Sequence, residues 1–164
     1  MEKKYELTDE IIGLQGRTLH RIKALRDFGD VKAGDLGGYI EREDNLSHEG
    51  ECWVGNDARV FEYARIYGKA QVTGYALVFG SAKISGKARV YDDAQVFDHA
   101  RIFGDARVFG DAKISDSAEV WGDAKIVDFA KVTNHAQIAA SITIAGNDCI
   151  NGFTRITTTS TTPA

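Results

Sequence analysis

The chain has few of the residues that usually stiffen a small protein or carry its chemistry. Its 164 residues include one proline, one methionine, two cysteines and four histidines. Cys52 and Cys149 are far apart in the sequence, so they suggest neither a disulfide framework nor a metal pair. No apolar run approaches the roughly 18 residues of a membrane span, and the N-terminus lacks the apolar core of a signal peptide. We therefore expect a single cytoplasmic domain without a cofactor and without membrane contact.

A regular repeat takes the place of these features. An alanine recurs every six residues from Ala58 to Ala136, and Val or Ile stands two places after each one. Two residues further on, the chain prefers Gly, Asp or Asn, which tolerate the positive φ of a tight corner. In an extended strand, residues two apart point to the same side. The repeat therefore predicts short strands separated by corners, wound into a prism filled with Ala, Val and Ile, which is a β-helix pattern.

The hexapeptide Val108-Phe109-Gly110-Asp111-Ala112-Lys113 resembles the repeat of the left-handed β-helix family. Phe109 departs from that repeat, which usually has Gly, Ala, Glu or Asp at its position. The resemblance implies a left-handed triangular coil of three hexapeptides, although the general crossover rule would favour the right hand. We predict an all-β, single-stranded left-handed parallel β-helix of about seven coils.

The same six-residue register extends backwards from Ala58. It places Cys52, Leu46 and Ile40 in the alanine column, and His48 and Arg42 in the aliphatic column. We therefore predict a solenoid over residues 34–156 that begins with two irregular rungs. Residues 1–33 are predicted to be a small N-terminal β cap, because a solenoid must cover its exposed strand edges. Residues 157–164 are predicted to be a polar tail.

The junction between cap and solenoid carries a second resemblance. Residues 21–31, 34–40 and 45–47 are similar to the entry segment of uncharacterised hexapeptide-repeat proteins from bacteria, phages and mobile elements. Some of those proteins are classed as transferases by fold alone. The resemblance implies kinship and not a reaction, because function depends on a site rather than on a fold.

Basic residues dominate the outward position between each Ala and its aliphatic partner. Nine of thirteen such residues from 59 to 131 are Lys or Arg. They form either a ladder for phosphates or a set of charges neutralised by nearby acids, such as Asp105 for Arg107 and Asp111 for Lys113. We favour neutralisation, because residues 58–164 hold 12 basic and 11 acidic residues. Nucleic acid is therefore not expected as a partner.

The next outward column is aromatic, and residues eighteen apart should share one face. The least charged face carries a candidate interface formed by Phe61, Leu77, Phe79, Gln95 and Phe97. Such an apolar patch favours self-association, and the left-handed β-helix resemblance implies a trimer. The alternative is that the aromatic rings only stack on one another and cover the backbone.

The histidines give weak signals. His99 and His135 share one edge column two coils apart, too far to hold one metal. Arg42 and His48 occupy aliphatic positions, which indicates either a pocket beneath the cap or a local change of register that turns them outward. We expect a non-catalytic rigid scaffold or interaction module. If the kinship with phages or mobile elements holds, it acts by binding a host component such as a protein. The alternatives are an acyltransferase-like enzyme with a site between subunits, and a binder of a ligand or nucleic acid.

Overall fold

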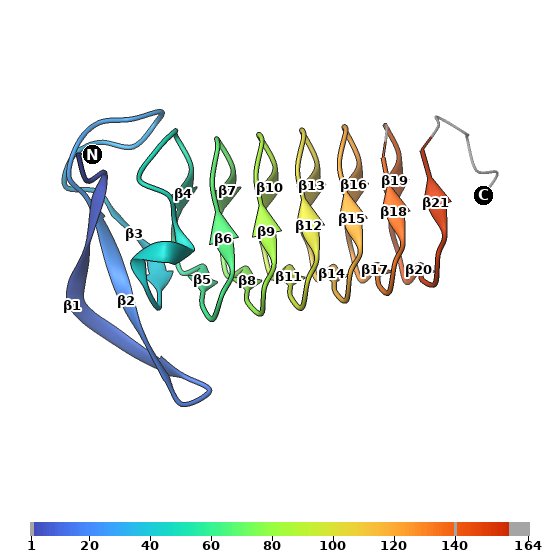
Figure 1. The fold of residues 1–164 in the computed structure, drawn as a ribbon, viewed down its shortest axis with the longest axis horizontal. Coiled ribbons are helices and arrows are strands. Elements are labelled where there is room, and N and C mark those ends of the chain that lie inside the picture. Colours follow the sequence, from blue (N-terminus) through green and yellow to red (C-terminus); the bar gives the residue numbers. More distant parts are fainter. Residues whose placement is uncertain (1, 140, 158–164) are drawn as a thin grey trace.

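The computed structural model describes residues 2–139 and 141–157 and shows a left-handed parallel β-helix closed at one end by a β-hairpin (Figure 1). The hairpin strands are β1 (Tyr5–Leu14) and β2 (Arg17–Ala24), followed by β3 (Leu36–Ile40) and a 3₁₀ turn, η1 (Glu43–Asn45). The two-residue strands that follow are β4 (Trp53–Val54), β5 (Arg59–Val60), β6 (Arg65–Ile66), β7 (Gln71–Val72), β8 (Leu77–Val78), β9 (Lys83–Ile84), β10 (Arg89–Val90), β11 (Gln95–Val96), β12 (Arg101–Ile102), β13 (Arg107–Val108), β14 (Lys113–Ile114), β15 (Glu119–Val120), β16 (Lys125–Ile126), β17 (Lys131–Val132), β18 (Gln137–Ile138), β19 (Thr143–Ile144), β20 (Cys149–Ile150) and β21 (Arg155–Ile156).

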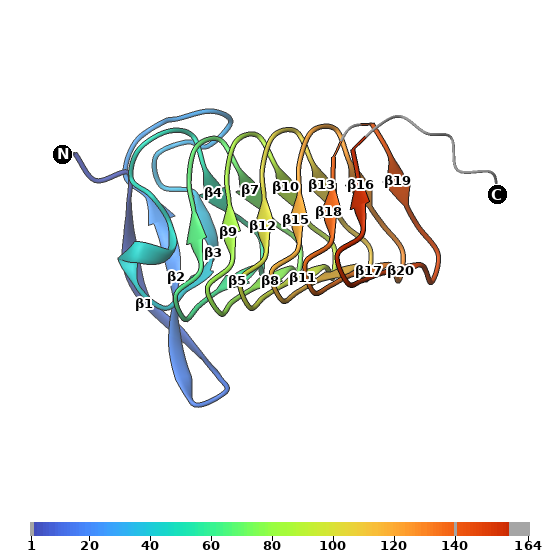
Figure 2. The ribbon, with the colours of Figure 1, turned by 45° about the vertical axis from the view of Figure 1, so that its right-hand side comes forward.

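The strands form three parallel walls, as Figure 2 shows. We name each wall by its first regular strand. The β4 face continues through β7 to β19, the β6 face through β9 to β21, and the β5 face through β8 to β20. Each strand pairs with the one eighteen residues later, as Arg89 does with Arg107. With six strands in each regular wall the solenoid has about six coils, slightly fewer than predicted.

The interior contains the predicted columns. Every alanine from Ala58 to Ala136 is buried, as is every aliphatic partner from Val60 to Ile144. Each buried Val or Ile contributes about 1.5–3 kcal/mol of gross burial free energy. Among the described residues, no helix is long and apolar enough to cross a membrane.

Carboxylates in the corners link successive coils. The Asp92 carboxylate accepts a hydrogen bond from the backbone N–H of Gly110 at 3.1 Å, and Asp98 accepts one from Asp116 at 3.2 Å. Both aspartates have positive φ, near 56° and 58°. Aspartate therefore does more at these corners than tolerate the turn, because it satisfies a backbone donor of the next coil.

The first coil departs from the predicted register by two residues. Ile40 pairs with Val60, and Leu46 bridges Ile66, so both lie in the aliphatic column and not in the alanine column. The prediction for these two residues was wrong, because six-residue spacing alone does not distinguish the columns. Their large side chains fit the positions of Val and Ile better than those of alanine. Cys52 does lie in the alanine column, buried beside Ala70, because Trp53 pairs with Gln71.

The N-terminal hairpin extends the β5 wall. Strand β2 pairs antiparallel with β3, and β3 pairs parallel with β5. At the hairpin turn, Arg17 donates to the Glu41 carboxylate at 2.9 Å and lies 3.4 Å from Glu62. Glu62 occupies a corner with φ near 60°, and its carboxylate accepts the N–H of Gly80 at 2.7 Å. Glu62 therefore links the coils as the aspartates do, and it also anchors the hairpin.

Replacing Glu41 with glutamine should lower the free energy of unfolding by about 1–2 kcal/mol at neutral pH. Burial alone would raise the pKa of Glu41, but hydrogen bonds from Arg17 and from the Glu62 backbone lower it overall. The native state therefore prefers the ionised carboxyl. This stabilisation is present above the ordinary pKa of 4.5 and is lost as the pH falls through the lowered value. In urea denaturation, the difference between wild type and variant should shrink from neutral pH to about pH 3; an unchanged difference would contradict the assignment.

Candidate functional site

The predicted interface on the β5 face is only partly accessible. Phe61, Phe79 and Phe97 form a ladder with ring centroids 5.0 Å apart and nearly parallel planes. Phe61 is 1% exposed, because the hairpin places Leu19 over it, with Ile12 and Leu14 beside them. Leu77, Phe79, Gln95 and Phe97 stay half-buried and face solvent. The structure thus brings the five residues together, but the cap already covers one of them.

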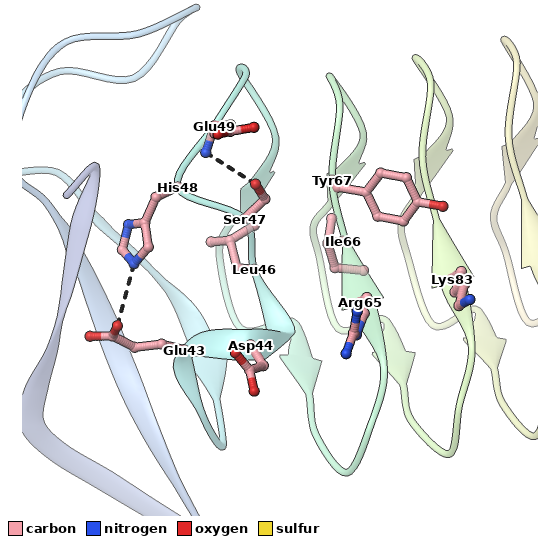
Figure 3. Close-up of a pocket in the computed structure, with 10 residues that line it drawn as sticks. All are labelled: Glu43, Asp44, Leu46, Ser47, His48, Glu49, Arg65, Ile66, Tyr67 and Lys83. Carbon is pink, nitrogen blue, oxygen red and sulfur yellow. Dashed lines mark hydrogen bonds and ion pairs between the residues drawn. The ribbon is translucent and has the colours of Figure 1, made fainter. Parts of the chain in front are cut away.

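His48 is turned toward the cap, on the side of the groove away from the solenoid wall (Figure 3). Its Nδ1 accepts a hydrogen bond from the backbone N–H of Lys4 at 3.1 Å, and its ring stacks on Tyr5 at 4.2 Å. The proton of the neutral imidazole is therefore on Nε2, which is buried and lies 3.5 Å from the Glu43 carboxylate. With Nδ1 bonded to the cap and Nε2 facing Glu43 of the first coil, His48 joins the cap to the solenoid and offers no base to a ligand.

Arg42 does not lie with His48. Its guanidinium is 5.1 Å from the centre of the Tyr63 ring and 3.5 Å from the Glu41 carboxylate. The two-residue shift of the first coil moves both Arg42 and His48 out of the aliphatic column. The local change of register therefore explains these two polar residues without a shared pocket.

The edge histidines lie at exposed corners. His99 and His135 both face solvent, and the ring of His135 stacks on Phe153 at 4.9 Å. Within residues 2–139 and 141–157, no group of three or more His, Cys, Asp or Glu side chains is placed to hold a metal.

The basic outward column does not form the ion pairs that we expected with its neighbouring acids. Every ion pair in the described part of the chain involves the cap or the first coil, and none includes the predicted partners Asp105 with Arg107 or Asp111 with Lys113. Asp57 pairs with Arg21 of the hairpin at 3.3 Å instead of with Arg59. Asp111 and Lys113 nevertheless line one hollow, so the acid lies near the base without forming an ion pair with it.

The β6 face combines unpaired cations with hollows. Arg65, Lys83 and Arg101 are paired in register on β6, β9 and β12. A groove of about 480 Å³ has Glu43, Asp44 and Glu49 on its cap side, and Arg65, Tyr67 and Lys83 on the solenoid wall (Figure 3). A second hollow of about 280 Å³ adjoins it further along the same face, lined by Tyr67, Lys83, Ser85, Arg101 and Phe103. Glu43, Asp44 and Glu49 line only the first hollow, and the charged residues that line the second are Lys83 and Arg101. Glu119 follows Arg101 in the same column on β15, so the cationic stack ends there.

Sequence reasoning missed this face, although its columns were visible in the repeat. We had interpreted the basic residues as neutralised by neighbouring acids and therefore not as a binding site. The hollow depends on side-chain conformations, which the spacing of residues in the sequence does not determine. Lys4 was missed too. It is fully buried, and its ammonium donates to the carbonyl oxygen of Cys52 at 2.7 Å.

Comparison with known proteins agrees with the architecture. No family model matches the chain. Over 54 residues, 32% of its length, the chain is 44% identical to YdcK, an uncharacterized acetyltransferase of Escherichia coli (strain K12). The chain has the hexapeptide-repeat β-helix fold. This β-helix matches only 17% of the length of YdcK, so the similarity covers a small part of that relative.

Proposed function

We propose that the protein is a rigid β-solenoid scaffold that binds an anionic ligand on its β6 face. The observation that carries the proposal is the stack of Arg65, Lys83 and Arg101, which has no ion-pair partner among the described residues. Paired strands lie about 4.8 Å apart, so these like charges repel one another. A negatively charged ligand would offset that repulsion, and the hollow beside Lys83 and Arg101 gives it room.

The proposal is tested by titrating inorganic pyrophosphate and following backbone amide resonances. Shifts should concentrate at residues 65–67, 83–85 and 101–103, and affinity should fall as salt rises. Lys83→Gln with Arg101→Gln should weaken binding at least about tenfold. Arg89→Gln with Arg107→Gln removes the same charge from the β4 face and is the matched control. Equal losses of pyrophosphate affinity in the two double variants would show that binding depends on overall charge, which would contradict a site on the β6 face.

Acetyl transfer is a second candidate, favoured by the identity with YdcK. The test is to incubate the protein with an acetyl thioester and candidate amine or hydroxyl acceptors, and to follow release of the thiol. Acceptor-dependent release that disappears in the Lys83→Gln, Arg101→Gln variant would replace the scaffold assignment with an enzyme. Absence of release with a bound donor would leave binding as the function.

Self-association through the exposed part of the β5 face is a further proposal, supported by half-buried Leu77, Phe79 and Phe97. The wild-type protein is expected to be an oligomer, with a trimer favoured. Leu77→Lys with Phe79→Lys should give a folded monomer in light scattering, because two charges would have to be desolvated in the contact. Tyr75→Lys is the control, since Tyr75 is exposed at a corner. An oligomer mass unchanged in the double variant would exclude this face.

A further inference from the structure

The aromatic ladder on the β6 face has a missing ring. Its outer column reads Tyr67, Ser85, Phe103 and Trp121, one residue for each coil. Phe103 and Trp121 stack at 5.4 Å with planes 1° apart, and Tyr91 stacks on Phe109 at 4.7 Å on the β4 face. At Ser85 no ring is present, so the ladder is interrupted for one coil between two aromatic residues.

The interruption coincides with the hollow of about 280 Å³. Trp121 covers one face of the Phe103 ring, and the other face is turned toward the coil of Ser85. Tyr67 forms the opposite wall, and Figure 3 shows its ring directed along the solenoid toward Lys83. Successive coils lie about 5 Å apart, so a ring over Ser85 would lie about 5 Å from the ring of Phe103. That separation is within the usual range for stacked aromatic rings.

The charged residues beside the hollow indicate which group a bound ring would carry. Lys83 and Ser85 are two residues apart and point outward together, and Arg101 lies beside Phe103 in the same way on the next coil. A ring stacked on Phe103 would therefore have two cations within reach of any negative group that it carries. The volume of about 280 Å³ lies just below the usual range of about 300–1,000 Å³ for ligand sites, which favours one ring system over an extended molecule.

We propose that the hollow over Ser85 binds a planar aromatic ring bearing a negatively charged group, as in a mononucleotide. The ring stacks on Phe103 and completes the ladder, and Lys83 and Arg101 hold the anionic group. This inference rests on the proposed anion-binding function and names the ligand class for the same face.

The test is to titrate adenosine monophosphate, inorganic phosphate and adenosine separately, with amide resonances and calorimetry as readouts. The mononucleotide should bind one to one and at least about tenfold more tightly than either part, because stacking and charge act together. Ser85→Phe should abolish this preference, since the new ring fills the gap. Phenylalanine already stands at the equivalent position of the other two faces, at Phe79, Phe97 and Phe109, so the variant should keep its melting temperature. Thr73→Phe extends the ladder beside Tyr91 on the β4 face and should bind like wild type.

The outcomes separate the two proposals. If inorganic phosphate binds as tightly as the mononucleotide and Ser85→Phe does not change either affinity, the proposal of a ring site over Ser85 is wrong. The proposal that the β6 face binds anions would then still hold. If none of these probes nor pyrophosphate binds, both are overturned. A single-stranded oligonucleotide that binds far more tightly and covers several coils would identify nucleic acid as the ligand and would refute a site for one ring.

Discussion

Replacing Lys4 with methionine is expected to lower the free energy of unfolding by about 3 kcal/mol. The ammonium of Lys4 is buried at the cap and donates to the carbonyl oxygens of Cys52 at 2.7 Å and Gly50 at 3.3 Å. It also lies 4.8 Å from the centre of the Phe28 ring. Methionine keeps the length of the side chain but leaves these carbonyls without a donor. Burial lowers the pKa of Lys4, and its contact with the Cys52 side chain offsets only part of this shift.

The matched control is Lys3→Met. Lys3 is the adjacent residue, and its ammonium pairs with Glu43 at 2.8 Å with most of the side chain exposed. Exposed ion pairs contribute little, so we expect a loss below about 1 kcal/mol. Urea denaturation measures the total loss, and hydrogen exchange at residues 46–54 reports whether the cap opens first. Equal losses for the two variants would show that Lys4 is not a specific anchor of the cap.

Replacing Gly86 with alanine is expected to destabilise the solenoid by about 2–3 kcal/mol. Gly86 has φ near 64°, and a Cβ there would lie 2.8 Å from the backbone nitrogen of Gly104 in the next coil. The clash is with backbone and not with a flexible side chain, so the two coils must shift to admit the methyl group. Differential scanning calorimetry should show a lower melting temperature.

Two further variants separate the causes of this loss. Gly152→Ala places a Cβ at a similar φ of 67° with no neighbour within 4 Å, so it should cost only about 1 kcal/mol. Gly86→Asp should be milder than Gly86→Ala, because its carboxylate can accept the N–H of Gly104 as Asp92 accepts that of Gly110. If Gly86→Ala and Gly152→Ala were equally destabilising, backbone conformation and not contact between coils would account for the effect.

The sequence predicted the structure best in the regular coils, where each residue has an equivalent in the same environment eighteen positions away. Val108 and Ala112 are buried because the same environment recurs in every coil, so one hexapeptide informs all the others. At Ile40 and Leu46 the spacing persisted, but the register had shifted by two residues. Side-chain size favours the correct column there, whereas periodicity does not.

The candidate site was less predictable, because it depends on interruptions of the repeat. The burial of Phe61 follows from the way the hairpin docks, and no repeat unit contains that information. The column Tyr67, Ser85, Phe103 can be derived from the repeat alone. Whether Lys83 and Arg101 are neutralised beside it depends on the direction of corner side chains, and spacing along a strand does not determine that direction.

The equivalence of the three walls has a consequence for how such a chain diversifies. A gain or loss of eighteen residues would lengthen or shorten the prism and leave every downstream side chain on its own face. A gain or loss of six would keep the interior intact but rotate the whole downstream surface onto the neighbouring face, bringing charges and rings of different walls side by side. Small insertions that are neutral for folding could therefore create new combinations of surface residues, such as a basic column next to a different aromatic ladder, without any substitution.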